Sequence, residues 1–193
     1  MTLAPWRSHL AGTLHRNRSL PVSRYLQLAT VRADGRPANR TVVFRGFLED
    51  TNQLQFITDI RSQKVEEINF YPWGEICWYF PQTREQFRIA GKLVLVSAEH
   101  PDSALCASRR RAWQEISEAA RVQFDWPHPG ANRAVSSAFE PTVPDAIEPL
   151  SNFCLLLLEP ETVDLLELRG APQNRLLYGR DGEGNWSARE VNP

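Results

Sequence analysis

The stretch FITDIRSQKVEEI, residues 56–68, begins with the apolar–polar alternation of a β-strand and ends with the pattern of an α-helix. The polar residues where the two patterns meet are Thr58, Asp59, Arg61, Ser62, Gln63 and Lys64. A polar turn with an N-cap at Ser62 is one explanation for them. An anion-binding site is the other, because a helix N-terminus offers unpaired N–H groups and the positive end of the helix dipole. The neighbouring segments have to decide between the two.

Composition places this stretch in an ordinary globular protein. The chain has 193 residues, is 42% hydrophobic and 23% charged, and has a net charge of −1. These values predict one soluble domain over residues 1–193, and they give no general reason to expect nucleic acid as a partner. No apolar run approaches the roughly 20 residues that span a bilayer, and the start, MTLAPWRSHL, lacks a secretory pattern. We therefore expect a cytoplasmic protein without a membrane partner.

Cysteine and histidine positions give no sign of a metal site. The three cysteines are odd in number and far apart, which is typical of reduced thiols. The four histidines are scattered along the chain. Neither set has the ligand spacing of a metal-binding motif, so no metal is predicted.

Strand patterns dominate the chain, with turn signals between them. We expect strands at 25–31, 39–47, 54–58, 75–80, 85–97, 174–180 and 185–191, and two more in 154–168 separated at Pro160. Helices are expected at 5–18, from Ser62 to just before Pro72, and at 101–124. Residues 126–149 contain five prolines, so 101–150 reads as a helical, proline-rich excursion. Because most strands are joined by short turns, the order favours an α+β, mainly β fold: an antiparallel barrel with peripheral helices.

Basic and amide side chains recur at the strand edges. They lie in NRTVVFR (39–45), TDIRSQK (58–64), REQFR (84–88) and NRLLYGR (174–180). Arginine can clamp a phosphate with its planar fork and lysine supplies a point charge. Taken singly, each arginine is more often a solvated surface residue. The phosphate loop GxxxxGK, the dinucleotide signature GxGxxG, and the hydrolase motifs GxSxG and HExxH are all absent from the sequence.

The order of these segments resembles the pyridoxamine 5′-phosphate oxidase family of FMN-binding split barrels. The segments that resemble its core are RTVVFRGF (40–47), FITDIRSQKVEEI (56–68) and CWYFPQTREQFRIAGKL (77–93). VDLLELRGAPQNRLLYGR (163–180) is similar to its C-terminal segment, and residues 28–47 are most similar to its Alr4036-type branch. The resemblance implies an antiparallel split β-barrel, a homodimer with FMN at the interface, and a flavin-dependent oxidoreductase acting on a small molecule.

The resemblance also assigns roles to individual residues. It implies that Thr58, Ser62, Gln63 and Lys64 surround the FMN phosphate, that Arg40 reaches the phosphate, and that Val42 and Val43 lie along the isoalloxazine ring. It implies that Gln86 and Arg175, supplied by the other subunit, contact the polar edge of the ring. Cations and hydrogen-bond donors suit that edge because a reduced flavin carries negative charge there. The resemblance thus favours the anion site at residues 58–64.

Other positions depart from the family pattern. Ala171 and Gln173 stand where the vitamin-phosphate oxidases have an arginine and a histidine, and Leu166 stands at a tryptophan position. Arg45 replaces a lysine and could still hold a substrate phosphate. The substrate is therefore pyridoxamine or pyridoxine phosphate or another small molecule. A flavin-binding module or carrier without turnover is an alternative, and a barrel that binds haem or F420 is a third.

Overall fold

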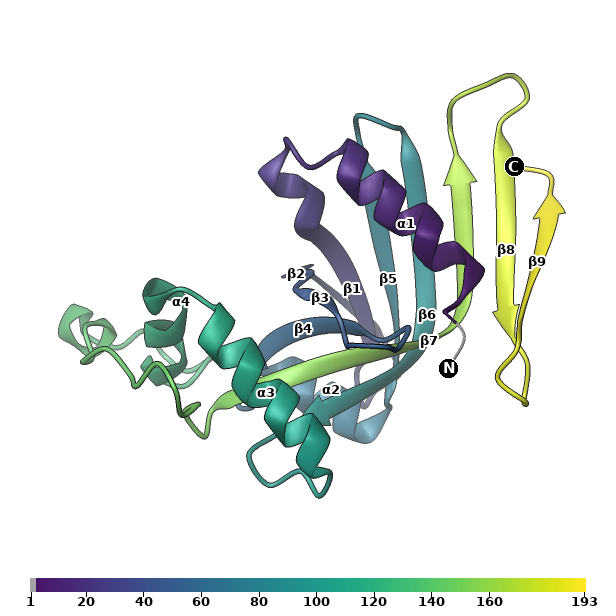
Figure 1. Cartoon of the computed structure of the whole chain (residues 1–193). Helices are drawn as coiled ribbons and strands as arrows, with labels where there is room; N and C mark the ends of the chain where they lie inside the picture. Colours follow the sequence, from purple (N-terminus) through teal and green to yellow (C-terminus); the bar gives the residue numbers. More distant parts are fainter. Residues whose placement is uncertain (1–2) are drawn as a thin grey trace.

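The computed structural model describes residues 3–193, which form nine strands and four α-helices. The strands are β1 (Tyr25–Val31), β2 (Pro37–Val43), β3 (Gly46–Phe47), β4 (Leu54–Asp59), β5 (Trp73–Phe80), β6 (Glu85–Val96), β7 (Phe153–Glu167), β8 (Asn174–Arg180) and β9 (Trp186–Val191). The helices are α1 (Pro5–Arg16), α2 (Gln63–Phe70), α3 (Ser103–Glu115) and α4 (Glu118–Val122). Figure 1 shows these helices around a strongly curved sheet. The predicted fold class, an antiparallel split barrel with peripheral helices, is confirmed.

The sheet divides at β7, which gives the barrel its split form. The strand order is β2-β1-β5-β6-β7-β4-β3, with β8 also pairing to β7 and β9 to β8. The first half of β7 pairs with β4 and its last six residues pair with β8, while β6 runs along both halves. Every pairing is antiparallel. One edge of β7 is therefore paired with β4 along its first half and with β8 along its second half. The β8–β9 hairpin is thus separated from β4.

The prediction of two strands separated at Pro160 was wrong, because β7 is continuous from Phe153 to Glu167. The β6–β7 register shifts between Ala90 and Gly91, and Pro160 lies opposite Gly91 at this irregularity. Proline has no N–H to donate, so it is tolerated where a bulge interrupts the ladder. Here the proline marks a bulge in a strand and not the end of one.

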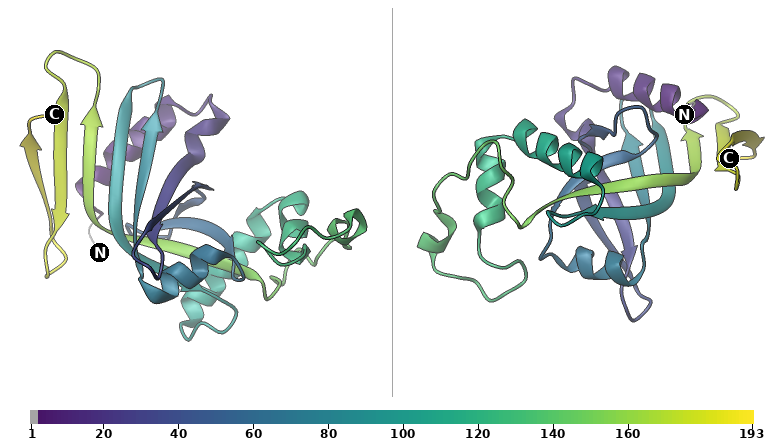
Figure 2. Two further views of the ribbon diagram at one scale, coloured as in Figure 1. Left: turned by 180° about the vertical axis from the view of Figure 1, so that it is seen from behind. Right: turned by 60° about the horizontal axis from the view of Figure 1, so that its bottom comes forward.

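The prediction of one helix over 101–124 was also wrong. Asp102 caps α3, its Oδ1 accepting from the N–H groups of Ala104 at 2.8 Å and Leu105 at 3.2 Å. The chain becomes extended at Ile116, and Ser117 caps the separate helix α4. Ile116, whose side chain is buried, is the C-cap of α3, and the Ser117 hydroxyl accepts from the Ala120 N–H at 3.3 Å to start α4. Figure 2 shows that the segment from α3 to the start of β7 projects from the barrel on the side away from the β8–β9 hairpin.

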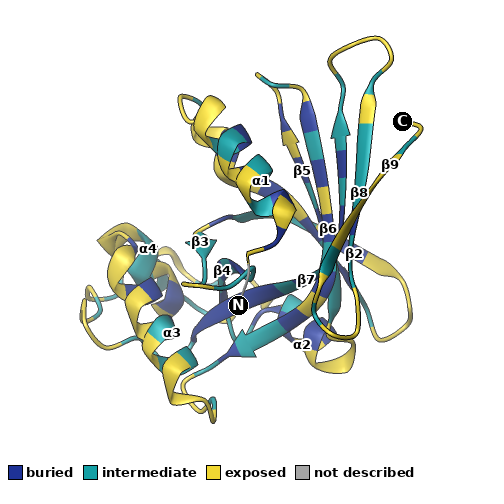
Figure 3. Ribbon diagram, turned by 45° about the vertical axis from the view of Figure 1, so that its right-hand side comes forward, coloured by how far each residue is buried: buried dark blue, intermediate teal, exposed yellow. Residues whose placement is uncertain are grey.

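Two apolar cores lie on opposite faces of β7. Leu156 and Leu158 belong to the core beneath α1, with Trp6 and Trp78. The alternate residues of β7 belong to a second core with Trp113 of α3. Burial on both faces explains the continuous apolar run in this strand, which is dark along its first half in Figure 3. No helix within residues 3–193 is long and apolar enough to cross a membrane.

Candidate functional site

Three of the residues predicted to bind an anion meet where β4 leads into α2. The Lys64 ammonium donates to the Thr58 hydroxyl at 2.9 Å and to the Ser62 hydroxyl at 3.0 Å. The two hydroxyls are themselves 3.2 Å apart. Thr58 and Ser62 are buried and Lys64 is half-buried, whereas Gln63 is exposed. The structure therefore brings Thr58, Ser62 and Lys64 together and leaves Gln63 at the surface beside them.

Ser62 is the N-cap residue of α2, but its side chain does not cap the helix. Its backbone has the extended conformation usual for an N-cap, with φ −76° and ψ 148°. The hydroxyl instead accepts from Lys64 and contacts Thr58. The first turn of α2 therefore receives no side-chain acceptor from its N-cap: the Val65 N–H donates to the Ser62 carbonyl oxygen at 2.9 Å, and the N–H groups of Gln63 and Lys64 are the ones left for an external acceptor.

Arg40 reaches α2 from β2 and pairs with Glu67, beyond the first turn of the helix. Its Nη2 is 2.6 Å from the Glu67 carboxylate, and its Nη1 donates to the Thr30 hydroxyl. Thr30 in turn donates to Glu67 at 2.5 Å. The Glu67 side chain is only 4% exposed, against 22% for Arg40. Glu67 was missed from the sequence, although an acidic residue beside the buried Ile68 of α2 is the signal that could have revealed it.

Lys64 carries a positive charge that the folded chain does not pair. Within residues 3–193 no carboxylate lies within ion-pair distance of its ammonium. Burial lowers the pKa of Lys64, and the like charge of Arg40 lowers it further. Lys64 contacts the two hydroxyls and Arg40 lies close enough to lower its pKa, so the two cations together suit an anion with several acceptor oxygens.

Arg61 lies within the polar stretch at 58–64, but its side chain does not join the cluster of Thr58, Ser62 and Lys64. Its guanidinium pairs with Asp59, with a shortest distance of 2.7 Å, and also donates to the carbonyl oxygens of Phe124 at 3.3 Å and Trp126 at 3.1 Å. These contacts fasten the segment after α4 to the β4–α2 turn. Arg61 therefore supports the anion site from outside and does not point into it.

The residues predicted to contact the flavin ring form a row across the other end of the sheet. Gln86 of β6 is opposite Leu166 of β7, and Leu166 is opposite Arg175 of β8. Directly opposed residues share one face of a sheet. Arg175 pairs with Asp164, its Nη2 lying 2.9 Å from the carboxylate. Gln86 and Arg175 thus lie on the same face with one leucine between them.

Within one chain this row is far from the anion site. Thr58 is opposite Cys154, whose neighbour Leu155 is opposite Val96 at the end of β6. Gln86 lies ten residues before Val96 in the same strand, which is about 33 Å of extended chain. Val42 and Val43, both half-buried in β2, follow Arg40 on the anion side. A single copy therefore contains the two halves of the predicted site without joining them.

Comparison with known proteins bears on both halves. The family model described as the FMN-binding domain of pyridoxamine 5′-phosphate oxidase matches residues 3–97. Over 196 residues the chain is 41% identical to pyridoxine/pyridoxamine 5′-phosphate oxidase 2 of Arabidopsis thaliana, covering 99% of this chain and 98% of that protein. The chain belongs to the pyridoxamine 5′-phosphate oxidase family.

Solved structures agree with this assignment. A pyridoxamine 5′-phosphate oxidase-related, FMN-binding protein from Nostoc punctiforme is 62% identical, with a TM-score of 0.97 and coverage of 100% of both chains. PhzG from Burkholderia lata, solved with tetrahydrophenazine-1-carboxylic acid, has a TM-score of 0.77 over 97% of this chain and 90% of its own. At 21% identity, PhzG shares the fold alone.

The departures from the oxidase pattern lie around the β7–β8 turn. Ala171 is exposed, Gln173 is half-buried, and Leu166 occupies the row between Gln86 and Arg175. The neighbouring Arg169 does not fill the gap that Ala171 leaves, because its guanidinium donates to the Gln82 carbonyl. In this chain the turn offers neither a free arginine nor a histidine.

Arg45, the predicted substrate contact, lies at a separate hollow. The hollow has a volume of about 410 Å³ and lies between the end of β2 and α3. Ser108 and Arg111 line its far side, and Arg111 pairs with Glu49 at 3.1 Å. Burial lowers the pKa of Arg45, and the nearby Arg24 lowers it further. The hollow is therefore lined by two arginines and a serine hydroxyl, together with the carboxylates of Glu49 and Glu115.

Proposed function

We propose that this chain binds FMN and acts as a flavin-dependent oxidoreductase on a small phosphorylated molecule. The observation that carries the proposal is the Lys64 ammonium, which donates to the hydroxyls of Thr58 and Ser62 at the start of α2, with a second cation, Arg40, close enough to lower its pKa. Such a site suits the phosphate of FMN, and neither riboflavin nor haem needs it. The names of the Arabidopsis and Nostoc relatives support the same cofactor and class of reaction.

In this proposal the protein holds and tunes the flavin. Arg40, Thr58, Ser62 and Lys64 bind the phosphate, while the β2 backbone at Val42 and Val43 lies along the ring. The flavin supplies the electron transfer when it is bound. Gln86 and Arg175 act at the polar edge of the ring, where an amide donor and a cation stabilise the charge of the reduced form.

We further propose that the functional unit is a homodimer. The two groups of residues lie about 33 Å apart along β6 in one chain, yet both are needed at one flavin. A second copy that brings its Gln86 and Arg175 to the first copy's phosphate site resolves this. The exposed Tyr79, opposite Gln86 in β5, extends the row and offers apolar surface for such a contact.

We propose that the substrate binds at Arg45 and the hollow beside it. Ser108 and Arg111 would complete a small anion site there, which suits a phosphorylated substrate. The name of the Arabidopsis relative favours pyridoxine or pyridoxamine 5′-phosphate. The absence of arginine and histidine at Ala171 and Gln173 favours slow turnover of these compounds, because glutamine cannot titrate near neutral pH as histidine does.

Cofactor binding is tested by titrating the apo protein with FMN and with riboflavin. We expect a clear preference for FMN, and Arg40→Ala or Lys64→Ala should weaken FMN binding more than tenfold, since a charge-assisted hydrogen bond contributes about 1.5–3 kcal/mol. Asn69→Ala is the matched control, because this exposed polar side chain lies near the other end of α2, away from the cluster. Equal affinity for both flavins, or normal FMN binding by both cation variants, would refute the phosphate site. A purified protein whose spectrum shows haem or F420 in place of flavin would do the same.

Turnover is tested by oxygen-dependent formation of pyridoxal 5′-phosphate from pyridoxine 5′-phosphate, beside an authentic oxidase. With FMN fully bound, we expect a rate lower by about a hundredfold or more, because two charged or titratable side chains are missing. A rate equal to that of the reference enzyme would contradict our interpretation of Ala171 and Gln173. If FMN is bound and no substrate of this class is oxidised, the chain is a flavin-binding module without its own turnover.

A further inference from the structure

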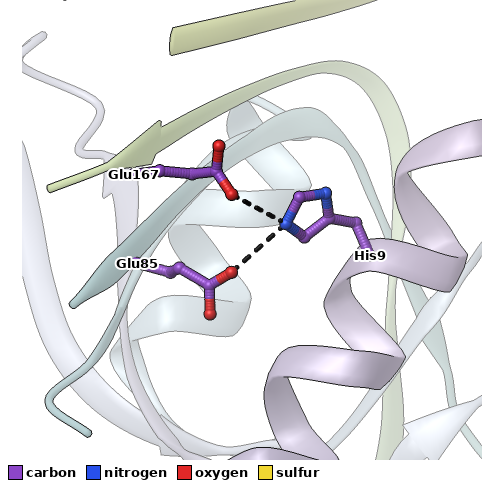
Figure 4. A group of neighbouring side chains, drawn as sticks. All are labelled: His9, Glu85 and Glu167. Atoms are coloured by element: carbon purple, nitrogen blue, oxygen red, sulfur yellow. Dashed lines mark hydrogen bonds and ion pairs between the residues drawn. The ribbon is translucent and has the colours of Figure 1, made fainter. Parts of the chain in front are cut away.

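His9 of α1 lies against two glutamates, one from each central strand. Its Nε2 is 3.2 Å from Glu85 in β6 and 3.3 Å from Glu167 in β7 (Figure 4). Glu85 is only 4% exposed, whereas His9 and Glu167 are half-buried. The scattered histidines in the sequence gave no hint of this cluster, because it joins residues that are far apart along the chain.

The two glutamates directly oppose each other in the β6–β7 register. Like charges at directly opposed positions destabilise a sheet, so a compensating cation is needed. Arg16 supplies one, its Nη2 lying 2.7 Å and 2.9 Å from the two oxygens of Glu85. Burial alone would raise the pKa of Glu85, but hydrogen bonds from Thr83, Arg16 and Thr13 outweigh it and lower the pKa. Glu85 is therefore ionised, and the two carboxylates with one guanidinium leave a net charge of −1.

His9 can complete the neutralisation. Its Nε2 faces two acceptors and so carries a proton, but a neutral ring protonated there would leave the net charge at −1. A doubly protonated ring donates from Nε2 and brings the net charge of the four groups to zero. The other charged or titratable groups beside this cluster are Arg169, which lines the same hollow as both glutamates, and Tyr178 of β8. Burial and then Glu167 raise the pKa of Tyr178, so it stays neutral here.

The three ligand-type atoms would also suit a divalent cation by spacing alone. Metal bonds of about 2.1 Å place neighbouring ligand atoms about 3.0–3.4 Å apart. However, the Arg16 guanidinium already lies 2.7 Å from Glu85 Oε1, the oxygen that would have to bind the metal. A second, doubly charged cation on the same oxygen would be repelled, which favours an imidazolium.

The cluster borders the residues that we assign to the flavin ring. Gln86 directly follows Glu85 in β6, and Arg175 directly follows Asn174, which opposes Glu167 in β8. Side chains alternate between the two faces of a strand. The carboxylate pair therefore lies on the inner face and the Gln86–Arg175 row on the outer face of the same strand ends.

We propose that His9 is a positioning residue. As an imidazolium it neutralises the repulsion between Glu85 and Glu167, and this three-residue charge clamp holds the strand ends that carry Gln86 and Arg175. The role in flavin binding rests on the proposed function, whereas the charge clamp itself does not. Histidine changes charge between about pH 5 and 8. On this proposal the clamp is present while the ring is charged and lost when it is neutral, which makes the fit of these strand ends depend on pH.

The test compares wild type, His9→Gln and Glu167→Gln at about pH 6 and pH 8.5, either side of the ordinary histidine range. The readouts are the unfolding midpoint of the apo protein and the dissociation constant for FMN. In wild type we expect FMN binding to weaken about five- to tenfold towards high pH, the lower end of ordinary coupling, with a parallel fall in the midpoint. His9→Gln should show the weaker values at both pH values, because an amide cannot become charged. Glu167→Gln should show the stronger values at both, because it removes the repulsion.

Controls separate this effect from other titrations. The FMN phosphate itself titrates near pH 6, so each value is read as a difference between variants at one pH. His15→Gln alters an exposed histidine of the same helix and should leave the wild-type profile unchanged. A purely structural His9 would lower stability without changing the pH profile, and His9→Gln retaining the wild-type profile in both readouts would overturn the proposal. The proposal would also be overturned if added zinc chloride raised the unfolding midpoint of wild type but not of His9→Gln, since that result assigns the cluster to a metal.

Failure to bind FMN at any pH would refute the proposed function. The pH profile of the apo protein would still decide the charge on His9.

Discussion

Arg40 can serve a phosphate only if its guanidinium is held in place beside α2, and Glu67 is the side chain that holds it. We expect Glu67→Gln to lower the free energy of unfolding of the apo protein by about 3 kcal/mol, because removing one partner leaves the other charge unpaired in a largely buried place. FMN should stabilise this variant more than wild type, since the phosphate becomes the counter-charge of Arg40.

Denaturant unfolding with and without FMN measures both effects. Glu66→Gln is the matched control, because Glu66 is the exposed neighbour of Glu67 in the same helix. Equal stability of the two variants would show that Glu67 does not hold Arg40.

Lys64 gives the site a pH dependence of known sign. Burial and Arg40 lower its pKa, so the folded apo protein binds fewer protons than the unfolded chain between the lowered pKa and the ordinary value near 10.4. In that window this group stabilises the apo protein as pH rises. A bound phosphate favours the charged ammonium, so FMN affinity should fall as the pH rises through the Lys64 pKa.

Titrations of FMN binding in the alkaline range check this decline. Lys64→Arg should retain binding and lose the decline, because arginine stays charged throughout. A decline that persists unchanged in Lys64→Arg would assign it to another group.

At the scale of elements, the bulge between β6 and β7 depends on Gly91. A Cβ at this position would overlap the carbonyl oxygen of Glu159 in the opposing strand. Gly91→Ala must therefore push apart the two central strands, and we expect a loss of about 3 kcal/mol of stability. Gly179→Ala in β8 is the control, since a Cβ there meets nothing within 4 Å.

Thermal unfolding of the two variants measures the difference. If both behave alike, the close approach at the bulge relaxes without cost. A weakened bulge should also weaken FMN binding, because β6 carries Gln86 at one end and ends beside the anion site at the other.

For the whole molecule, the proposed site requires two copies. A ligand that binds only the assembled dimer stabilises that dimer by mass action. We therefore expect the apo protein to dissociate at higher concentration than the FMN-bound form. Sedimentation across a dilution series, with and without FMN, measures the shift. A monomer that holds FMN tightly at every dilution would contradict the two-chain site.

Local patterns in the sequence were enough to predict most of the elements and the grouping of polar side chains at the start of α2. Alternating apolar residues and turn signals predicted seven of the nine strands within a few residues, while 39–47 was expected as one strand and forms β2 and β3. The polar stretch at 58–64 predicted that Thr58, Ser62 and Lys64 lie together at the start of α2. These features depend on neighbours a few residues apart, which the sequence shows directly. The resemblance to the oxidase family rested on the same local motifs, and the family was confirmed by comparison.

Only the tertiary structure decided how distant segments meet. It showed that Pro160 lies at a bulge inside one strand, that Glu67 pairs with Arg40, and that His9 faces two opposed glutamates. It also placed Gln86 and Arg175 in one row, far from Lys64 in the same chain. Each of these contacts depends on strand register and on how α1 and α2 pack on the sheet. Register is fixed by side chains that are distant in the sequence, so no local pattern contains it.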